Sequence, residues 1–343
     1  MDQIHGLDEL SRRVLDKGLC ASCGSCVGRC PYVTEFKGRT VVLHRCTVEH
    51  GRCFAYCPMT FFDPEAASRM VFGTRAEASG IGRYEDVKAS RATDETVAEA
   101  AQGGGTVTSL LIAALNSGMI DSAVLTSSIP GEARGRGFVG TTVAEIASCS
   151  GSKFAGSHSL SVLREALDQG RSRIGVVALP CQVRSLRKMA LYDLKQEKLR
   201  ERVPLVIGLF CNWAFSPRQF AEFLGKELGL GHIGKIDIPP PPAQVLEVET
   251  QGRTVSVPLD LVRPMIQDAC RVCPDMTAEF ADVSVGMYEG RPGWNTLVVR
   301  TAAGAGVVGE ALAAAGLETD VFPSENLEHL KEASEQKRTR AAQ

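Results

Sequence analysis

Two cysteine runs near the N-terminus have the spacing of iron–sulfur ligands. The first consists of Cys20, Cys23, Cys26 and Cys30, followed directly by Pro31, in the order C-x2-C-x2-C-x3-C-P. In bacterial ferredoxins the leading cysteines of such a run bind one cluster, and its last cysteine binds the neighbouring cluster. Zinc is the general alternative for clustered cysteines, but this order is typical of iron–sulfur proteins. The run therefore predicts an iron–sulfur cofactor.

The second run is an incomplete copy of the first. It keeps Cys46, Cys53 and Cys57-Pro58, lacks one cysteine, and has an extra residue between Cys46 and Cys53. If the last cysteine of each run serves the other cluster, the two runs together form two sites. The ligands of the first cluster site are then Cys20, Cys23, Cys26 and Cys57. The ligands of the second cluster site are Cys30, Cys46, Cys53 and one further group.

The fourth ligand of the second cluster site is open from the sequence. His50 or Glu49 would fill the gap, because imidazole and other side chains bind iron. A further alternative is a cluster that lacks one iron atom, and the alternative for His50 itself is a solvent-facing loop residue. We expect two 4Fe-4S clusters in this segment, one of them with an uncertain ligand.

A second set of cysteines provides four further candidate ligands, although buried cysteines are also common as structural residues. Cys270 and Cys273 form a C-x2-C pair, while Cys181 and Cys211 each follow a predicted strand. The carboxyl ends of strands are where α/β sheets place their sites, so these thiols are expected to meet. The remaining Cys149 is interpreted as a small buried apolar residue.

Periodicity beyond the cysteine runs predicts an α/β fold with a mixed sheet and flanking helices. Strands are expected at 120–125, 173–180, 203–210, 282–285 and 296–300. Helices are expected at 106–115, 159–169, 182–195 and 217–227, with Gly118 ending the first of these. Strands alternating with helices favour parallel pairings. The stretch 233–262, with prolines at 239–242, is expected to be a β-insertion.

The texture of the chain suggests a small domain attached to a larger one. We assign 1–64 to a ferredoxin-like domain that begins with a short helix over 1–19. Residues 65–100 are interpreted as a connection, 101–335 as a catalytic domain and 336–343 as a tail. The last dozen residues are expected to fray.

Composition excludes several partner classes. With 38 Lys and Arg against 40 Asp and Glu, the formal net charge is −2, which gives no reason to expect nucleic acid or an anionic membrane surface. No apolar run approaches about 18 residues, so no membrane span is expected. The N-terminus shows no signal region, and spaced reduced thiols fit a cytoplasmic protein.

Several short motifs together resemble a known family. They are Gly103-Gly104-Gly105-Thr106-Val107-Thr108-Ser109, Gly151-Ser152-Lys153-Phe154, Leu179-Pro180-Cys181-Gln182, Phe210-Cys211-Asn212 and Ala269-Cys270-Arg271-Val272-Cys273-Pro274-Asp275. From about residue 20 to 335 the chain is similar to the beta subunits of coenzyme F420-reducing hydrogenase and F420-linked dehydrogenases. The N-terminal segment resembles that of the input subunit of F420H2 dehydrogenases.

The resemblance implies one FAD, a 4Fe-4S cluster in the catalytic domain and a site for the deazaflavin F420. By motif position the cluster ligands are Cys181, Cys211, Cys270 and Cys273, which brings the expected number of clusters to three. A glycine-rich turn that opens a helix offers backbone N–H groups to a pyrophosphate. The residues expected to bind the flavin are Gly103, Gly104, Gly105, Thr106, Thr108, Ser109, Ser152, Lys153, Trp294 and Asn295.

Two interpretations are open for Lys153, and two for the basic residues Arg184, Arg187 and Lys188. A cation near the flavin N1 stabilises the reduced ring, but Lys153 is equally an exposed ammonium. Arg184, Arg187 and Lys188 follow Cys181 on a predicted helix and would meet an anionic coenzyme tail, or form an ordinary charged face.

The expected function is that of a flavin iron–sulfur oxidoreductase subunit. It would exchange hydride between F420, or a similar two-electron carrier, and FAD, and relay single electrons to a partner. Expected partners are hydrogenase, formate dehydrogenase or heterodisulfide reductase subunits, or a ferredoxin. The alternatives are a stand-alone ferredoxin-dependent reductase of a small organic substrate and a non-enzymatic electron-transfer module.

Overall fold

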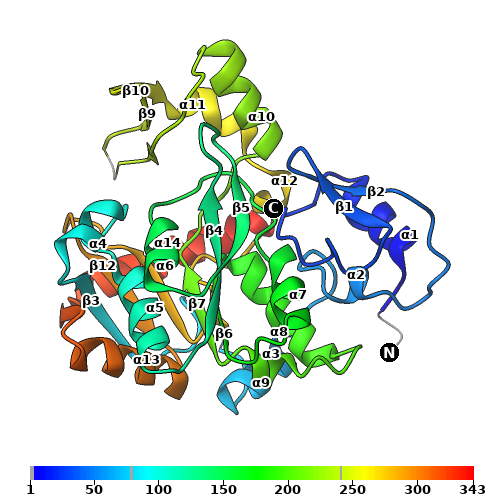
Figure 1. The fold of residues 1–343 in the computed structure, drawn as a ribbon, viewed down its shortest axis with the longest axis horizontal. Helices are drawn as coiled ribbons and strands as arrows, with labels where there is room; N and C mark the ends of the chain where they lie inside the picture. The colour runs from blue at the N-terminus through cyan, green and yellow to red at the C-terminus, as the bar shows by residue number, and fades with distance from the viewer. Residues whose placement is uncertain (1–3, 78–79, 240–241) are drawn as a thin grey trace.

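A mixed sheet with helices on both faces forms the centre of the molecule (Figure 1). This computed structural model describes residues 4–77, 80–239 and 242–343. In those residues eight strands form the sheet, in the order β13 (Leu317–Val321), β3 (Asp86–Ala92), β12 (Asn295–Val299), β11 (Val283–Met287), β7 (Leu205–Leu209), β6 (Ile174–Ala178), β4 (Ser122–Ser128) and β5 (Gly135–Gly140). Strands β4, β6, β7 and β11 are parallel, whereas β5, β12, β3 and β13 pair antiparallel with their neighbours. The predicted mixed α/β sheet is confirmed.

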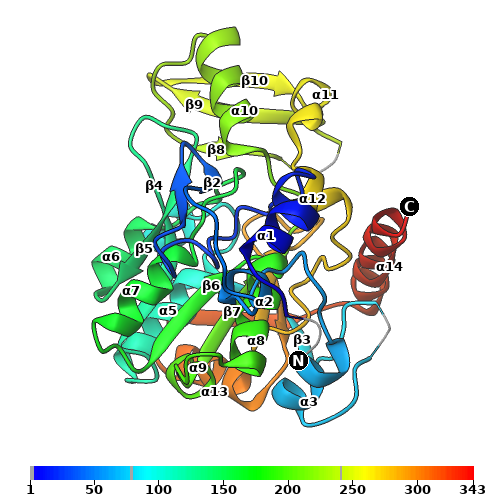
Figure 2. The ribbon, with the colours of Figure 1, turned by 90° about the vertical axis from the view of Figure 1, so that its right-hand side faces the viewer.

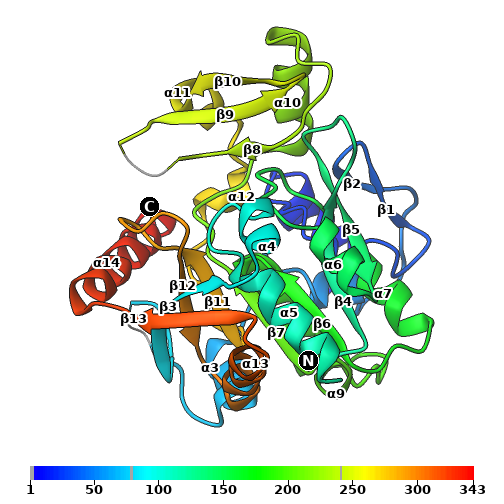
Figure 3. The ribbon, with the colours of Figure 1, turned by 60° about the vertical axis from the view of Figure 1, so that its left-hand side comes forward.

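Two apolar cores lie on the two faces of this sheet. One core packs β6 and β7 against α7 (Ser161–Asp168), α8 (Pro180–Tyr192) and α9 (Leu199–Arg202). The other packs the opposite face against α5 (Thr106–Asn116), α6 (Val143–Ser148) and α13 (Ala302–Ala313), as Figure 3 shows. The parallel strands are buried on both faces, which is why their sequences are continuous apolar runs without alternation.

The expected helices and strands of the catalytic domain are present. Three further strands of the sheet, β3, β5 and β13, were not predicted. Residues 65–100, interpreted as a connection, contain α3 (Pro64–Phe72), α4 (Glu95–Ala100) and β3, which lies between β12 and β13. The buried positions of β3 are small residues, including Ala89, Ser90 and Ala92. Small side chains give little hydrophobic periodicity, so the strand left no clear pattern in the sequence.

The C-terminal segment does not fray as expected. Helix α14 (Ser324–Ala341) continues through the residues interpreted as a tail. Lys337 is 4% exposed, and Arg338 forms an ion pair with Glu279 at 2.6 Å. These buried contacts hold the end of the chain against the catalytic domain.

The β-insertion forms a separate layer with its own core. The predicted stretch 233–262 contains β8 (Ile236–Asp237), β9 (Val245–Thr250), β10 (Arg253–Pro258) and α11 (Leu259–Val262). The layer also includes the helix predicted before it, observed as α10 (Pro217–Glu222) and a π-helical turn (Phe223–Glu227), and a 3-10 turn after it (Arg263–Met265). Phe215, Phe220, Leu246 and Val262 are among its buried residues. The chain then returns to the sheet through α12 (Asp268–Arg271). Of the expected proline turn at 239–242, residues 240 and 241 lie outside the described part.

The N-terminal cysteine segment forms a lobe against one side of the catalytic domain, at the right in Figure 1 and facing the viewer in Figure 2. It contains α1 (Leu7–Leu10), a π-helical turn (Ser11–Leu15), the hairpin β1 (Val33–Phe36) and β2 (Arg39–Val42), and α2 (Arg52–Ala55). Its core combines Leu7, Leu10, Val14 and Phe54 with cysteine side chains. The expected helix near the N-terminus is confirmed.

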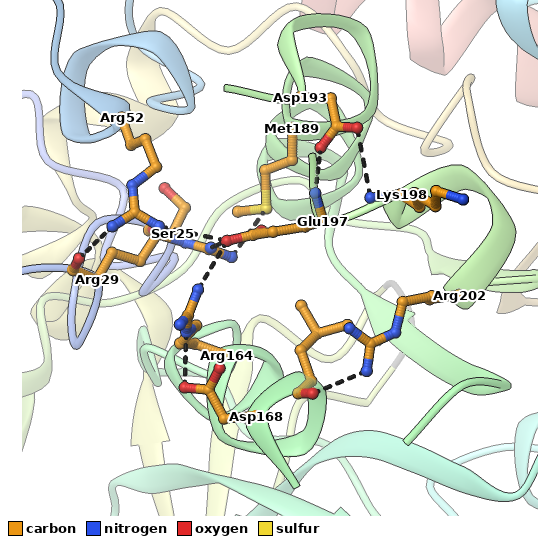
Figure 4. A network of polar contacts seen from close by, with 11 residues as sticks. Ser25, Arg29, Arg52, Arg164, Asp168, Met189, Asp193, Glu197, Lys198 and Arg202 are labelled. Carbon is orange, nitrogen blue, oxygen red and sulfur yellow. Dashed lines mark hydrogen bonds and ion pairs between the residues drawn. The ribbon is translucent and has the colours of Figure 1, made fainter. Parts of the chain in front are cut away.

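One buried carboxylate connects both cysteine runs to the catalytic domain (Figure 4). Glu197 forms ion pairs with Arg29 at 3.1 Å, Arg52 at 3.3 Å and Arg164 at 2.9 Å. Arg29 lies within the first cysteine run, and Arg52 precedes Cys53 in the second. The side chains of Glu197 and Arg29 are only 9% and 2% exposed. Removing the carboxylate would leave buried guanidinium groups without their counter-charge.

We therefore expect Glu197→Ala to lower the free energy of unfolding by about 3–5 kcal/mol, the usual cost of breaking a buried ion pair. The measurement is urea denaturation under anaerobic conditions. Glu201→Ala is the control, because that side chain is 73% exposed and pairs only loosely with Lys198 at 3.9 Å. The control should cost about 0.5 kcal/mol or less. Equal losses in both variants would contradict a structural role for Glu197.

Candidate functional site

The four cysteines of the third cluster site line one cavity. Strands β6 and β7 are adjacent and parallel, so Cys181 and Cys211, which follow them, come to the same edge of the sheet. The C-x2-C segment is bound to this edge by backbone hydrogen bonds from Gln267 to Ala214 and from Cys211 to Met276. The cavity lining includes Cys181, Cys211, Cys270 and Cys273. The sequence prediction that these thiols meet agrees with this arrangement.

Burial disfavours the deprotonated form of these thiols as long as no cation is bound beside them. It raises the pKa of Cys211 to about 12 and that of Cys181 well above its usual range, and the neighbouring thiols add to both shifts. Metal ligands must be deprotonated, and a bound cation provides the charge that makes this possible. The donor set therefore fits a group that brings several iron charges to the cavity.

Lys337 is a member of this site that the sequence did not reveal. Its ammonium donates hydrogen bonds to the backbone oxygens of Cys211 at 2.6 Å and Asp275 at 2.7 Å. Burial lowers its pKa, but the surrounding thiols and Asp275 outweigh that effect, so the pKa is raised. Lys337 lies on α14, far from the cysteine motifs in sequence, and no local pattern marks it.

The first cluster site combines the two N-terminal runs crosswise, in the expected way. Burial raises the pKa of Cys57 to about 12, with the Cys23 and Cys20 thiols adding to the effect. Burial likewise raises the pKa of Cys26, and its neighbours include Cys23, Cys57 and Cys20. Cys57 thus lies with the first run although it ends the second.

The second cluster site gathers Cys30, Cys46 and Cys53. Burial raises the pKa of Cys53 to about 11, and the Cys30 and Cys46 thiols contribute to the shift. His50 is exposed, and its Nδ1 lies 2.7 Å from the backbone oxygen of Ile4. Glu49 is also exposed. Neither side chain is among the groups that act on Cys53, so the fourth ligand stays open.

The thiols of each set are spread more widely than the ligands of one ion. Across 4–77, 80–239 and 242–343, no three His, Cys, Asp or Glu side chains lie close enough to hold a single metal ion. An assembly of iron and sulfide is larger than one ion, and its thiolates bind different iron atoms.

The glycine turn before α5 packs against the start of β12. A Cβ on Gly104 would lie 2.9 Å from the Oδ1 of Asn295 and from the backbone oxygens of Gly293 and Ser90. Asn295 accepts a hydrogen bond from the backbone N–H of Thr106 at 3.4 Å, and its amide donates to the Gly286 oxygen. The structure thus brings the predicted glycines, Thr106 and Asn295 together at a helix N-terminus.

The other residues expected at the flavin divide into two groups. Thr108 and Ser109 are largely buried in the first turns of α5, and the Thr108 hydroxyl lies 3.2 Å from that of Ser150. Ser152 is exposed. The Lys153 ammonium is neither exposed nor free, since it donates to the backbone oxygens of Cys149, Ser150 and Gly151. Burial lowers its pKa to about 8.

Trp294 does not join Asn295 at the glycine turn. The guanidinium carbons of Arg91 and Arg291 lie 4.9 and 3.6 Å from the centre of its ring. Arg91 follows Ser90 on β3, and successive side chains of a strand point to opposite faces. Since Ser90 pairs with Asn295, the tryptophan belongs to the other face of the sheet.

The basic run on α8 points into the protein. Lys188 donates to the backbone oxygens of Cys57 and Phe61, and Arg187 donates to that of Phe280 and pairs with Asp282. Arg184 lies over the ring of Phe62. The interpretation as an ordinary charged face is wrong, because these cations contact buried segments.

Family models cover most of the catalytic domain. The N-terminal model of the coenzyme F420 hydrogenase/dehydrogenase beta subunit matches residues 87–164, and the C-terminal model matches 171–325. The chain is 32% identical over 256 residues to coenzyme F420 hydrogenase subunit beta of Methanothermobacter thermautotrophicus, covering 73% of this chain and 88% of that protein. The chain belongs to the family of F420 hydrogenase/dehydrogenase beta subunits.

Other members of this family are similar over more of the chain. One of the subunits of F(420)H(2) dehydrogenase of Methanosarcina mazei is 26% identical, with 85% of this chain and 82% of that protein covered. Coenzyme F420-dependent sulfite reductase of Methanocaldococcus jannaschii is 30% identical over 85% of this chain, which is 46% of that protein. Membership places the chain among proteins of F420-linked redox electron transfer.

A solved structure has the same fold. One chain in the F420-reducing NiFe hydrogenase complex of Methanosarcina barkeri has a TM-score of 0.70 and 27% identity, and the match covers 76% of this chain and 91% of that chain. The two family models leave out residues 20–57, which hold the first and second cluster sites, and Lys337. None of the helices described is long and apolar enough to cross a bilayer.

Substitution of single cysteines tests the ligand assignment. We expect Cys181→Ala to lose about four iron atoms per chain, the content of one 4Fe-4S cluster. Cys149→Ala is the matched control, because Cys149 packs with the apolar residues of the α5 side and belongs to no thiol set. It should retain all its iron. Iron and acid-labile sulfide are measured after anaerobic purification, and equal iron in both variants would refute the third cluster site.

Proposed function

We propose that this chain exchanges electrons between coenzyme F420 and a partner protein through FAD and three 4Fe-4S clusters. Family membership supports the coenzyme, because relatives are named for F420. The single observation that carries the relay is the gathering of the cysteines into three thiol sets within one chain.

The three thiol sets follow one another in space. Burial is the largest cause of the raised pKa of Cys181 in the third site, and the charge of Cys23 in the first site is the next largest. The two thiols are therefore close enough to interact. The charge of Cys53 in the second site likewise contributes to the raised pKa of Cys26 in the first site. This order supports a path from the third site through the first to the second, at the N-terminal end of the molecule.

The residues proposed for FAD are those of the glycine turn and the helix it opens. Gly103, Gly104 and Gly105 bring bare backbone to the N-terminus of α5, whose dipole favours a pyrophosphate. Asn295 holds this turn in place, and Thr108 supplies a hydroxyl. When bound, FAD supplies the conversion between hydride and single-electron chemistry, which iron–sulfur clusters do not perform. Lys153 orders the loop after α6 through its hydrogen bonds to backbone oxygens.

The partner is proposed to be another redox subunit, of hydrogenase, formate dehydrogenase or heterodisulfide reductase type, or a ferredoxin. The second thiol set supports an exit at the N-terminal segment, because it lies at the far end of the path that begins at the third set. The alternative of a stand-alone reductase uses the same cofactors with electrons entering at this end.

Anaerobic reduction of the holoprotein by F420H2 tests the proposed function. We expect the flavin absorbance to bleach first and the cluster absorbance to fall with it, because the clusters accept the electrons. NADH and dithionite serve as comparison reductants. Bleaching by dithionite alone would rule out F420 as the donor, and colourless protein would rule out the cofactors.

A methyl group at Gly104 tests the flavin site. The new Cβ would meet three oxygen atoms at 2.9 Å, two of them backbone, so the turn must shift. We therefore expect Gly104→Ala to reduce the FAD content by at least about tenfold, which corresponds to about 1.4 kcal/mol of binding free energy. Gly309→Ala is the control, since no atom lies within 4 Å of its Cβ position on α13. Full FAD content in Gly104→Ala would refute the assignment.

A further inference from the structure

Helix α8 presents one stripe of side chains to residues 56–62, where the second cysteine run ends. Cys181, Arg184 and Lys188 are three and four residues apart, so they lie on the same face of the helix. Lys188 donates to the Cys57 oxygen at 2.6 Å, and Ser185 donates to the Tyr56 oxygen at 2.8 Å. The stripe therefore runs from the third cluster site to the first.

Arg184 is the unpaired member of this stripe. Its guanidinium carbon lies 4.6 Å from the centre of the Phe62 ring, which supports it from one side. Its Nε is buried and has no hydrogen-bond partner among the described residues. Burial lowers the pKa of Arg184, and Cys273, Asp275, Cys57 and Cys181 oppose that effect. Its place on the helix face between Cys181 and Lys188, whose ammonium binds the Cys57 oxygen, puts the charge between the third and the first thiol sets.

A buried cation without a hydrogen-bonded carboxylate costs free energy unless negative charge is bound nearby. A cluster held by cysteine thiolates is such a charge, and its reduction potential rises when the added electron is stabilised by a neighbouring cation. The potential of a second cluster nearby is raised by the same charge. The cation also weakens the repulsion between two reduced clusters.

We propose that Arg184 is a positioning residue that raises the reduction potentials of the first and third clusters together and so allows both to be reduced at once. This inference rests on the proposed iron–sulfur relay. On reduction each cluster takes up one electron, no bond forms or breaks, and the electron comes from the added reductant.

The experiment is an anaerobic dithionite titration of the full-length holoprotein, followed by electron paramagnetic resonance. In Arg184→Met, which keeps a long side chain on Phe62, two of the three reduction steps should move to lower potential by at least about tenfold in the reduced-to-oxidised ratio, or about 59 mV. The step of the second cluster should stay in place as an internal control. Arg184→Lys keeps the positive charge, so its reduction potentials should return most of the way to the wild-type values.

Arg187→Met is the matched control on the same helix. It removes an equal charge, but Arg187 is bound to the Phe280 oxygen and Asp282 rather than to a cluster site. Its potentials should equal those of the wild type. Unchanged potentials in Arg184→Met, an equal shift of all three steps, or an equal shift in Arg184→Lys would each overturn the proposal.

Iron content separates the remaining outcomes. If Arg184→Met and Arg184→Gln both lose iron from two sites while Arg184→Lys keeps it, the charge is required to hold the clusters rather than to set their potentials, and the proposal is overturned. Loss of iron from all three variants shows a steric role and overturns it. Wild-type protein without three reduction steps refutes the proposed relay, whereas wild-type steps that Arg184→Met leaves unmoved refute only the role of Arg184.

Discussion

The contact between α8 and the segment at 56–62 is the constraint on which the rest of the molecule depends. Cys181 lies in the first turn of this helix at the edge of the sheet, and Lys188, near its other end, donates a hydrogen bond to the backbone oxygen of Cys57. The helix is packed on β6 and β7 through its apolar face, so its position is fixed by the core of the catalytic domain. The distance between the first and third cluster sites is therefore set by a rigid element.

Buried cations balance the thiol sites from several sides. Lys337 reaches the third site from α14, Lys188 reaches the first from α8, and Arg184 lies between them. Burial lowers the pKa of Lys188 to about 7, so its charge depends on the negative charge nearby. Such groups are costly in an apolar interior and become favourable when an anionic cluster is bound. Cofactor binding and folding are thus expected to stabilise each other.

Local patterns predicted much of this structure because the cysteine spacing and the apolar strands are short-range signals. The position of Cys57 among the thiols of the first run was predicted from ferredoxin spacing, and the ends of β6 and β7 were predicted from continuous apolar runs. Lys337 and β3 were not predicted. Lys337 meets Cys211 across 126 positions, and β3 is built of small residues whose burial depends on its neighbours. The exposure of Ser152 and the buried hydrogen bonds of Lys153 are also tertiary facts that no local pattern contains.

In the proposed relay, clusters of the first and third sites lie next to each other along α8. The most direct measurement is the electron paramagnetic resonance spectrum of the fully reduced holoprotein. Adjacent reduced clusters interact magnetically, so the account predicts a broadened, coupled spectrum that simplifies when Cys181 is replaced by alanine. A spectrum equal to the sum of isolated clusters, unaltered by that substitution, would contradict it.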